Sequence, residues 1–141
     1  MANRQLVVFE MAGEEYGIDV SAVNGILRLK NFQIRKLPSV PPIIEGVINL
    51  RGNVNYVYNL NKLFELPEKQ IDIESKIIMV YSGEQTVGYI VDEVTDIVHI
   101  PEENIEQAPG FITKIQGEYI TGVGKVDDRL IIMLDTEKIS M

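Results

Sequence analysis

Residue types that often carry chemistry are absent or rare in this sequence. The 141 residues include no cysteine and a single histidine, His99. The lack of cysteine excludes a disulfide framework and a thiolate metal site. His99 stands between two apolar residues of an expected strand, and a catalytic base needs a positioned partner. We therefore expect a half-buried structural histidine and no metal site.

Long apolar runs and phosphate-binding motifs are also missing. No apolar run approaches the ~20 residues that a transmembrane helix needs, and the first residues lead straight into an expected strand without a signal-peptide pattern. No glycine-rich loop ends in Lys-Ser or Lys-Thr, which argues against a nucleotide. We expect a cytoplasmic protein without membrane insertion and without a cofactor.

The charge is distributed unevenly along the chain. Residues 1–70 hold eight Lys or Arg and seven Asp or Glu, a net charge of +1, whereas residues 71–141 hold five and fourteen, a net charge of −9. The acidic second half argues against nucleic acid, whose phosphates require a basic face. Two interpretations remain: an acidic surface that aids solubility, or a near-neutral first half at which partners dock.

The sequence contains a diluted copy of itself. Residues 46–63 match residues 122–139 at an offset of 76, and residues 17–26 match residues 88–97 at an offset of 71. The offset changes only between matching blocks, which indicates one unit used twice. A unit of roughly 70 residues is close to the lower limit for a core of its own. We therefore expect the two units to share apolar surface.

Short strands separated by turns dominate both copies. Turn signals every eight to twelve residues are typical of small barrels or sandwiches. A short helix is expected over residues 59–64 with Asn59 as its N-cap, and a polar stretch at residues 67–74 is the best linker. These features divide the chain into one subdomain at about 14–70 and another at about 71–141, with the first strand open to either. The expected strands cover residues 6–11, 16–20, 26–30, 45–50, 53–58, 76–81, 86–91, 97–100, 119–126 and 129–134.

Arg51 is the most informative single side chain. It lies at the tip of an expected hairpin, where the second copy has Asp127, so arginine is not a requirement of the turn. One interpretation is an exposed residue that only solubilises the tip. The other is a forked donor for a partner's carboxylate or carbonyl groups, because arginine is enriched at binding hot spots. Paired carboxylates of a hydrolase stay open, since acidic residues are abundant and nothing selects a pair.

Several motifs occur in order over nearly the whole chain. They are Tyr-Gly-Ile-Asp-Val at residues 16–20, Glu-Gly-Val-Ile-Asn-Leu-Arg-Gly at 45–52, Val-Gly-Tyr-Ile-Val-Asp-Glu-Val at 87–94, Glu-Tyr-Ile-Thr-Gly-Val-Gly at 118–124 and Asp-Arg-Leu-Ile-Ile at 128–132. Together they resemble the CheW family of chemotaxis coupling proteins. The resemblance implies an all-β fold of two five-stranded SH3-like β-barrels, packed around a shared apolar core with a few short helices.

The resemblance also implies a non-enzymatic adaptor. Such proteins couple methyl-accepting chemoreceptors to the chemotaxis histidine kinase in a two-component signal transduction system. The implied partners are the regulatory domain of the kinase and the cytoplasmic tip of the receptor, so the protein is expected at receptor arrays on the inner membrane. Two alternatives remain: an adaptor of the same fold in another sensory array, such as one for surface motility, and a small carboxylate-dependent hydrolase.

Candidate partner-binding residues follow from the resemblance. Arg51 corresponds to the arginine associated with the receptor-side function. The apolar residues expected around the junction of the barrels are Val20, Val23 and Ile26, with Val87 and Val94 from the other barrel. For each of these aliphatic residues, packing in a barrel core is the competing interpretation.

The chain departs from the family pattern in two places. Gly25 stands where an acidic residue is common, and Val-Asn-Tyr-Val-Tyr at residues 54–58 replaces an aliphatic stretch with a proline. A buried Asn55 without hydrogen-bond partners would cost roughly 1–3 kcal/mol. Outward-facing Tyr56 and Tyr58 would form an amphipathic surface of the kind favoured at interfaces. The backbone donor of Tyr56, which a proline lacks, would permit strand addition at a sheet edge.

Overall fold

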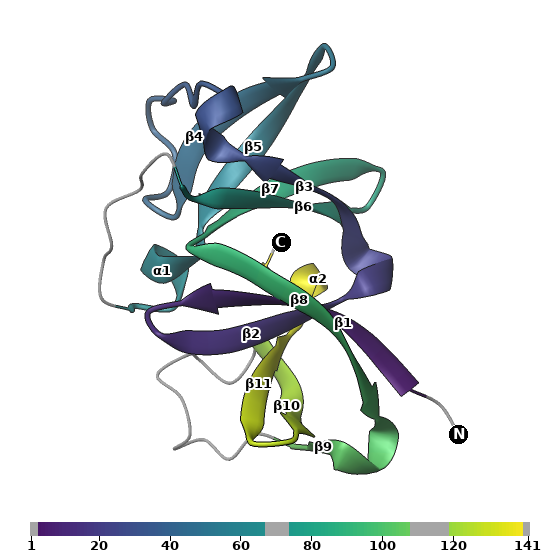
Figure 1. The fold of residues 1–141 in the computed structure, drawn as a ribbon. Helices are drawn as coiled ribbons and strands as arrows, with labels where there is room; N and C mark the ends of the chain where they lie inside the picture. The colour runs from purple at the N-terminus through teal and green to yellow at the C-terminus, as the bar shows by residue number, and fades with distance from the viewer. Residues whose placement is uncertain (1–2, 67–73, 108–118, 140–141) are drawn as a thin grey trace.

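The computed structural model describes residues 3–66, 74–107 and 119–139, which form two curved β-sheets (Figure 1). We call the sheet with strand order β8-β1-β2-β11-β10-β9 barrel A, and the sheet with order β3-β6-β7-β5-β4 barrel B. The expected all-β class with two barrels is confirmed. Barrel A contains β1 (Asn3–Met11), β2 (Glu14–Asp19), β8 (Glu93–Pro101), β9 (Ile105–Glu106), β10 (Ile120–Val126) and β11 (Arg129–Leu134). Barrel B contains β3 (Val23–Arg28), β4 (Ile44–Leu50), β5 (Asn53–Asn59), β6 (Lys76–Ser82) and β7 (Gln85–Val91).

Short helices connect or follow the strands. The α-helices are α1 (Leu60–Leu63) and α2 (Thr136–Ile139), and the 3-10 helices are η1 (Val20–Ala22), η2 (Leu29–Asn31) and η3 (Glu102–Asn104). The expected cap is confirmed, since the Asn59 side chain accepts a hydrogen bond from the Lys62 N–H at 3.4 Å. The strand expected at residues 26–30 begins earlier, at Val23, and η2 ends it. Most of the expected linker, residues 67–73, lies outside the described residues.

The two barrels exchange hairpins between the sequence copies. The β1-β2 hairpin comes from the first copy, yet it pairs with β8 and β11 of the second. The β6-β7 hairpin comes from the second copy, yet it pairs with β3 and β5 of the first. The sheets therefore divide the chain differently from its two sequence halves, and η1 carries the chain from barrel A into barrel B (Figure 1).

The pairing register is the same in both barrels. Met133 lies opposite Gly17 in barrel A, as Val57 lies opposite Gly88 in barrel B. A register shift in the β4-β5 pairing recurs at the matching place in β10-β11, and the shift between β3 and β6 recurs between β8 and β1. The repeat in the sequence is therefore a repeat of backbone geometry.

A glycine lets an additional segment close each barrel. In barrel B, Arg35 and Val47 exchange two backbone hydrogen bonds of 2.9 Å, and a Cβ on Gly46 would collide with the Arg35 carbonyl. In barrel A, a Cβ on Gly122 would lie 2.8 Å from the carbonyl oxygen of Glu106 in β9. The two-residue strand β9 is thus the counterpart of the bridge at Arg35, and each barrel has five main strands.

Buried side chains form one shared cluster and two barrel interiors. The shared cluster lies between the sheets and includes residues of both, as expected for units too small to fold alone. Its buried members are Phe9, Met11, Tyr16, Ile18, Tyr58, Leu60, Phe64, Ile78, Val80, Val87, Tyr89, Val91, Ile132, Leu134 and Ile139. The interior of barrel A contains Leu6, Val8, Val98, Ile100, Ile131 and Met133, and that of barrel B contains Leu29, Ile48, Val57, Ile77, Met79 and Ile90.

Candidate functional site

Five of the eight candidate residues lie on one face of barrel B. Directly paired residues of a sheet point to the same face, so the strand pairings define two rows across it. We call this the outer face of barrel B, because it lies opposite the barrel interior. One row contains Val23, Val80, Val87 and Tyr56, and the next contains Ile26, Ile78, Tyr89 and Tyr58.

The outer face is buried at its centre and exposed at its two margins. Val87 is 5% exposed and Tyr58 is 8% exposed, and both belong to the shared cluster. Tyr56 at one margin and Ile26 at the other are each 45% exposed. Three strand spacings separate β5 from β3, about 14 Å. Barrel A covers the centre of this face, so the two margins are separate surfaces, and the burial of Val87 and Tyr58 favours packing for these two positions.

Val87 does not lie where the sequence halves place it. It belongs to β7 and shares barrel B with Val23 and Ile26, because the β6-β7 hairpin is exchanged. Its expected assignment to the other barrel is wrong. Val94 does lie in the other barrel, in β8, where it pairs with Phe9 of β1. Val94 and Val23 are both half-buried and pack against the shared cluster. The remaining candidates stand apart from the outer face: Val20 is half-buried in η1 and Arg51 is exposed at the β4-β5 turn.

Arg51 adopts a backbone conformation that arginine rarely takes. Its φ is +54°, Gly52 follows with φ +86°, and the Asn49 side chain accepts a hydrogen bond from the Gly52 N–H at 3.0 Å. The left-handed region costs a residue with a Cβ roughly 1–2 kcal/mol, and asparagine, aspartate or glycine is the usual choice. Asp127 has φ +52° at the same position of barrel A, so the backbone requires this geometry. An arginine stands here although the turn disfavours it.

Asn55 is buried and has hydrogen-bond partners. It is 6% exposed, its Oδ1 accepts a hydrogen bond of 2.6 Å from Thr86 Oγ1, and its Nδ2 donates to the Asn53 carbonyl at 3.2 Å. These bonds remove the penalty expected for an unpartnered amide. Strand addition at Tyr56 has no place here, because β5 lies between β4 and β7 in the sheet. Tyr56 is 45% exposed, and Val54, two residues before it on the same face of β5, is 73% exposed.

Polar side chains interact at the end of the β4-β5 hairpin that lies away from the Arg51 turn. Glu45 Oε1 accepts hydrogen bonds from Asn59 Nδ2 at 2.9 Å and forms an ion pair of 3.0 Å with Lys62 Nζ. Burial raises the pKa of Glu45, but the hydrogen bonds from Asn59 and Lys62 outweigh it and lower the pKa below its usual value. Burial, and to a smaller extent Tyr56, raises the pKa of Tyr58, so its hydroxyl stays neutral at physiological pH.

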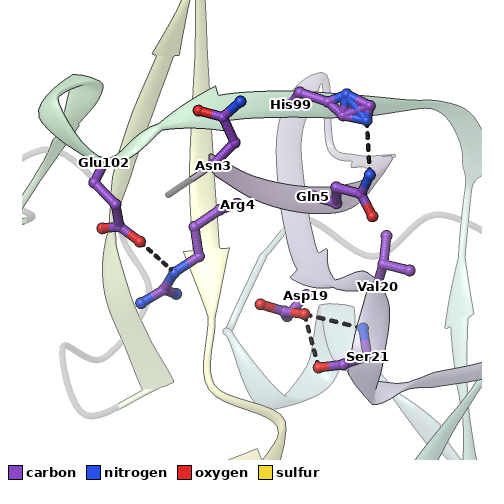
Figure 2. Close-up of a pocket in the computed structure, with 8 residues that line it drawn as sticks. All are labelled: Asn3, Arg4, Gln5, Asp19, Val20, Ser21, His99 and Glu102. Carbon is purple, nitrogen blue, oxygen red and sulfur yellow. Dashed lines mark hydrogen bonds and ion pairs between the residues drawn. The ribbon is translucent and has the colours of Figure 1, made fainter. Parts of the chain in front are cut away.

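Val20 lines a polar depression of about 550 Å³ at the outer end of β1 (Figure 2). Its polar side chains already bind one another: Arg4 Nε donates to Glu102 Oε1 at 3.1 Å, Gln5 Nε2 and His99 Nε2 are 2.9 Å apart, and Asp19 accepts from Ser21 Oγ at 2.8 Å. His99 is exposed, so its expected half-buried position is wrong. Since His99 binds Gln5 and the Ser21 hydroxyl donates to a carboxylate, the nucleophile–base pair of covalent catalysis is not formed here.

An ion-pair network at the rim of barrel A escaped the sequence analysis. Arg129 donates two hydrogen bonds of 3.0 Å to Asp96 and one of 2.9 Å to Glu15. The Arg129 hydrogen bond and that of Thr95 hold the pKa of Asp96 below its usual value. The matching positions in barrel B are Asn53, Gly25 and Thr86. A search for charged residues without a charged counterpart in the other copy would have found this network.

Within residues 3–66, 74–107 and 119–139, no group of three or more His, Asp or Glu residues could hold a metal ion. None of the helices in these ranges has the length and apolarity needed to cross a bilayer.

Comparisons with known proteins agree on one family. The CheW-like domain matches residues 5–141. The chain is 36% identical to the chemotaxis protein CheW of Bacillus subtilis over 96% of its own length and 85% of that protein. It is 32% identical to the CheW protein of Klebsiella aerogenes, over 96% of this chain and 81% of that protein. A solved structure, the scaffolding protein TtCheW from Thermoanaerobacter tengcongensis, superposes with a TM-score of 0.85 at 36% identity, covering 96% of this chain and 86% of that one.

Proposed function

Because the chain belongs to the CheW-like domain family, we propose that it holds a chemotaxis histidine kinase and methyl-accepting chemoreceptors together in one signalling assembly. The protein is a coupling adaptor of bacterial chemotaxis and a scaffold rather than an enzyme. The hydrolase and the adaptor of a different array are not favoured. Its place in the cell, on this proposal, is the receptor array at the inner membrane.

The conformation of Arg51 is the observation that carries the assignment of a partner site. The residue is exposed and sits in the left-handed region at φ +54°, a conformation that the equivalent turn of barrel A gives to the better-suited Asp127, so the turn needs the conformation but not the arginine. Strained residues that persist without a structural need are markers of function. The guanidinium at the tip is free to donate to a carboxylate or to the carbonyl groups at the end of a helix.

The two margins of the outer face provide separate contacts for two partners. The margin at β5 presents Tyr56 and Val54 beside the Arg51 turn, and we assign it to the helical tip of the receptor. The margin at β3 presents Ile26 and Val23, and we assign it to the regulatory domain of the kinase. Aromatic and arginine side chains are enriched among residues that dominate binding energy, which favours the first margin as the tighter anchor.

The experiment measures binding of a receptor cytoplasmic fragment and of the kinase regulatory domain, separately and together, by calorimetry. Arg51→Glu is expected to weaken receptor binding by about 2 kcal/mol, roughly 30-fold. Kinase binding and the thermal unfolding midpoint should stay nearly constant. Asp127→Lys is the matched control, because it reverses a charge at the same turn position of barrel A.

Two results would contradict the assignment. Equal loss of receptor binding in both turn variants would show a general charge effect in place of a site at Arg51. Unfolding of the Arg51→Glu variant, by circular dichroism, would make Arg51 a structural residue.

A further inference from the structure

One dipeptide of barrel B has a chemistry that the adaptor function does not use. Asn24-Gly25 is the only Asn-Gly pair in the sequence. It lies in β3, where the pairing with β6 shifts register between Val23 and Gly25. Asn24 is exposed, and a Cβ placed on Gly25 would meet no atom within 4 Å. The pair therefore combines a reactive sequence, an irregular backbone and free space.

We propose that Asn24 is a site of spontaneous deamidation. The backbone nitrogen of Gly25, after losing its proton to solvent, attacks Cγ of Asn24 and forms a C–N bond that closes a five-membered succinimide. The bond from Cγ to Nδ2 breaks, and ammonia leaves with a proton from water. A second water molecule opens the ring to aspartate or isoaspartate. The net change consumes one water, releases one ammonia and needs no oxidant or reductant.

Glycine at position 25 makes this attack possible. A side chain on the residue that supplies the nitrogen would hinder its approach to Cγ, and glycine reaches backbone conformations that other residues avoid. The reaction also needs β3 to leave its extended pairing for a moment. β3 is the first strand in the order of barrel B, and an edge strand opens at lower cost than a central one.

One hydrogen bond restrains the reactive side chain. Asn24 Nδ2 donates to the hydroxyl of Tyr81 at 3.2 Å, across from β3 to β6. Tyr81 is itself 50% exposed, so this bond competes with water and breaks readily. The bond sets the rate at which Asn24 rotates toward the Gly25 nitrogen, and its loss speeds the reaction.

The product changes the charge of the strand that carries one partner-facing margin. Deamidation places a carboxylate between Val23 and Ile26, on the strand that we assign to the kinase domain. This consequence rests on the proposed function, whereas the chemical step does not. The matching strand of barrel A already bears an acidic residue, Asp96, at the position of Gly25. Deamidated β3 therefore resembles its counterpart more closely in charge, and the charge contrast between the two barrels decreases.

The chemical arm of the test incubates the whole protein in mildly alkaline buffer and follows tryptic peptides by mass spectrometry. A gain of about 1 Da at Asn24, or about 3 Da in water labelled with oxygen-18, marks the reaction. Exposed Asn53 and Asn104 in the same sample are internal controls, because neither precedes glycine. Gly25→Ala should slow the gain at least about tenfold, which corresponds to about 1.4 kcal/mol of barrier. Tyr81→Phe should accelerate it several-fold.

The outcomes separate the two parts of the proposal. A gain at Asn24 no faster than at Asn53 or Asn104 would overturn the site, whatever the partners do. If the Tyr81→Phe variant deamidates at the wild-type rate, the hydrogen bond between Asn24 and Tyr81 does not restrain the reaction. In the second arm, Asn24→Asp and Asn24→Gln are compared for binding to the kinase regulatory domain, and an equal affinity would overturn the consequence while leaving the chemistry intact.

Discussion

Barrel A and barrel B share a backbone plan and differ in what they expose. Their pairing registers, their bulges and their closing glycines correspond strand by strand. Their rims do not correspond, because Arg129 binds two acids in barrel A where barrel B has uncharged Asn53, Gly25 and Thr86. Duplication has kept the positions that fix geometry, and divergence has occurred where side chains meet solvent or partners.

The exchanged hairpins make the charge contrast larger than the sequence halves suggest. Barrel B, counted as residues 20–66 and 74–91, holds seven Lys or Arg and four Asp or Glu, a net charge of +3. Barrel A, counted as residues 3–19, 92–107 and 119–139, holds four and fourteen, a net charge of −10. The exchange moves the acidic β1-β2 hairpin into barrel A. A scaffold with one acidic and one basic barrel can hold two partners in a defined orientation, since complementary potentials fix register.

The largest expected loss of stability comes from adding a methyl group at Gly46 or Gly122, the glycines that let an additional segment close each barrel. Gly46→Ala should lower the free energy of unfolding by about 3 kcal/mol, because its Cβ collides with the Arg35 backbone and its φ of +155° disfavours a side chain. Gly122→Ala should cost about 1–2 kcal/mol, because β9 has only two residues and can shift. Urea denaturation measures both values. Equal losses would mean that the two barrels close in equivalent ways.

The buried amide of barrel B tests whether the two interiors are interchangeable. Asn55 occupies the position of Ile131, which is fully buried in barrel A. Asn55→Ala should cost about 2 kcal/mol, since it leaves the Thr86 hydroxyl without its partner. The double variant Asn55→Ile with Thr86→Val should be more stable than Asn55→Ala and close to the wild type, because replacing both polar partners by apolar ones is nearly neutral. A double variant no more stable than Asn55→Ala would show that barrel B requires a polar interior.

The strands were predictable from the sequence because their signals are local and repeated, whereas the arrangement as two SH3-like barrels was implied by the family resemblance. Turn residues, the alternation of apolar and polar residues and the repeat at offsets of 76 and 71 locate the strands. The N-cap at Asn59 depends only on the next three residues. The hairpin exchange was not predictable, because either arrangement of β1-β2 buries the same apolar face. For the same reason Val87 was assigned to the wrong barrel. The Arg129 network joins residues 114 and 33 positions apart in the chain, and no local pattern reports such a contact.

Acid should weaken the ion-pair network of Arg129 in barrel A. The Arg129 and Thr95 hydrogen bonds lower the pKa of Asp96 in the folded state, whereas the unfolded value is about 3.9. Its stabilising contribution is therefore present above about pH 4 and disappears as the pH falls through the folded pKa. The Asp96 side chain is 41% exposed, so solvent screening limits the contribution to about 1 kcal/mol.

The measurement is the free energy of unfolding as a function of pH below about 5. Asp96→Asn should lower stability near neutral pH and flatten the acid dependence. Asp127→Asn, in the exposed turn of the same barrel, is the control and should leave the curve nearly unchanged. If the two variants show the same slope, the network does not contribute measurably.

The smallest expected effect is at the Arg51 turn of barrel B and the Asp127 turn of barrel A. Arg51→Gly should raise stability by up to about 1 kcal/mol, because glycine removes the left-handed penalty at φ +54° although it adds entropy to the unfolded chain. Asp127→Gly should change stability less, because aspartate tolerates this region better than arginine does. Thermal melts of both variants beside the wild type give the comparison. A stabilised Arg51→Gly variant that loses receptor binding would mean that barrel B gives up stability at this turn for recognition, and a destabilised one would mean that Arg51 supports the hairpin itself.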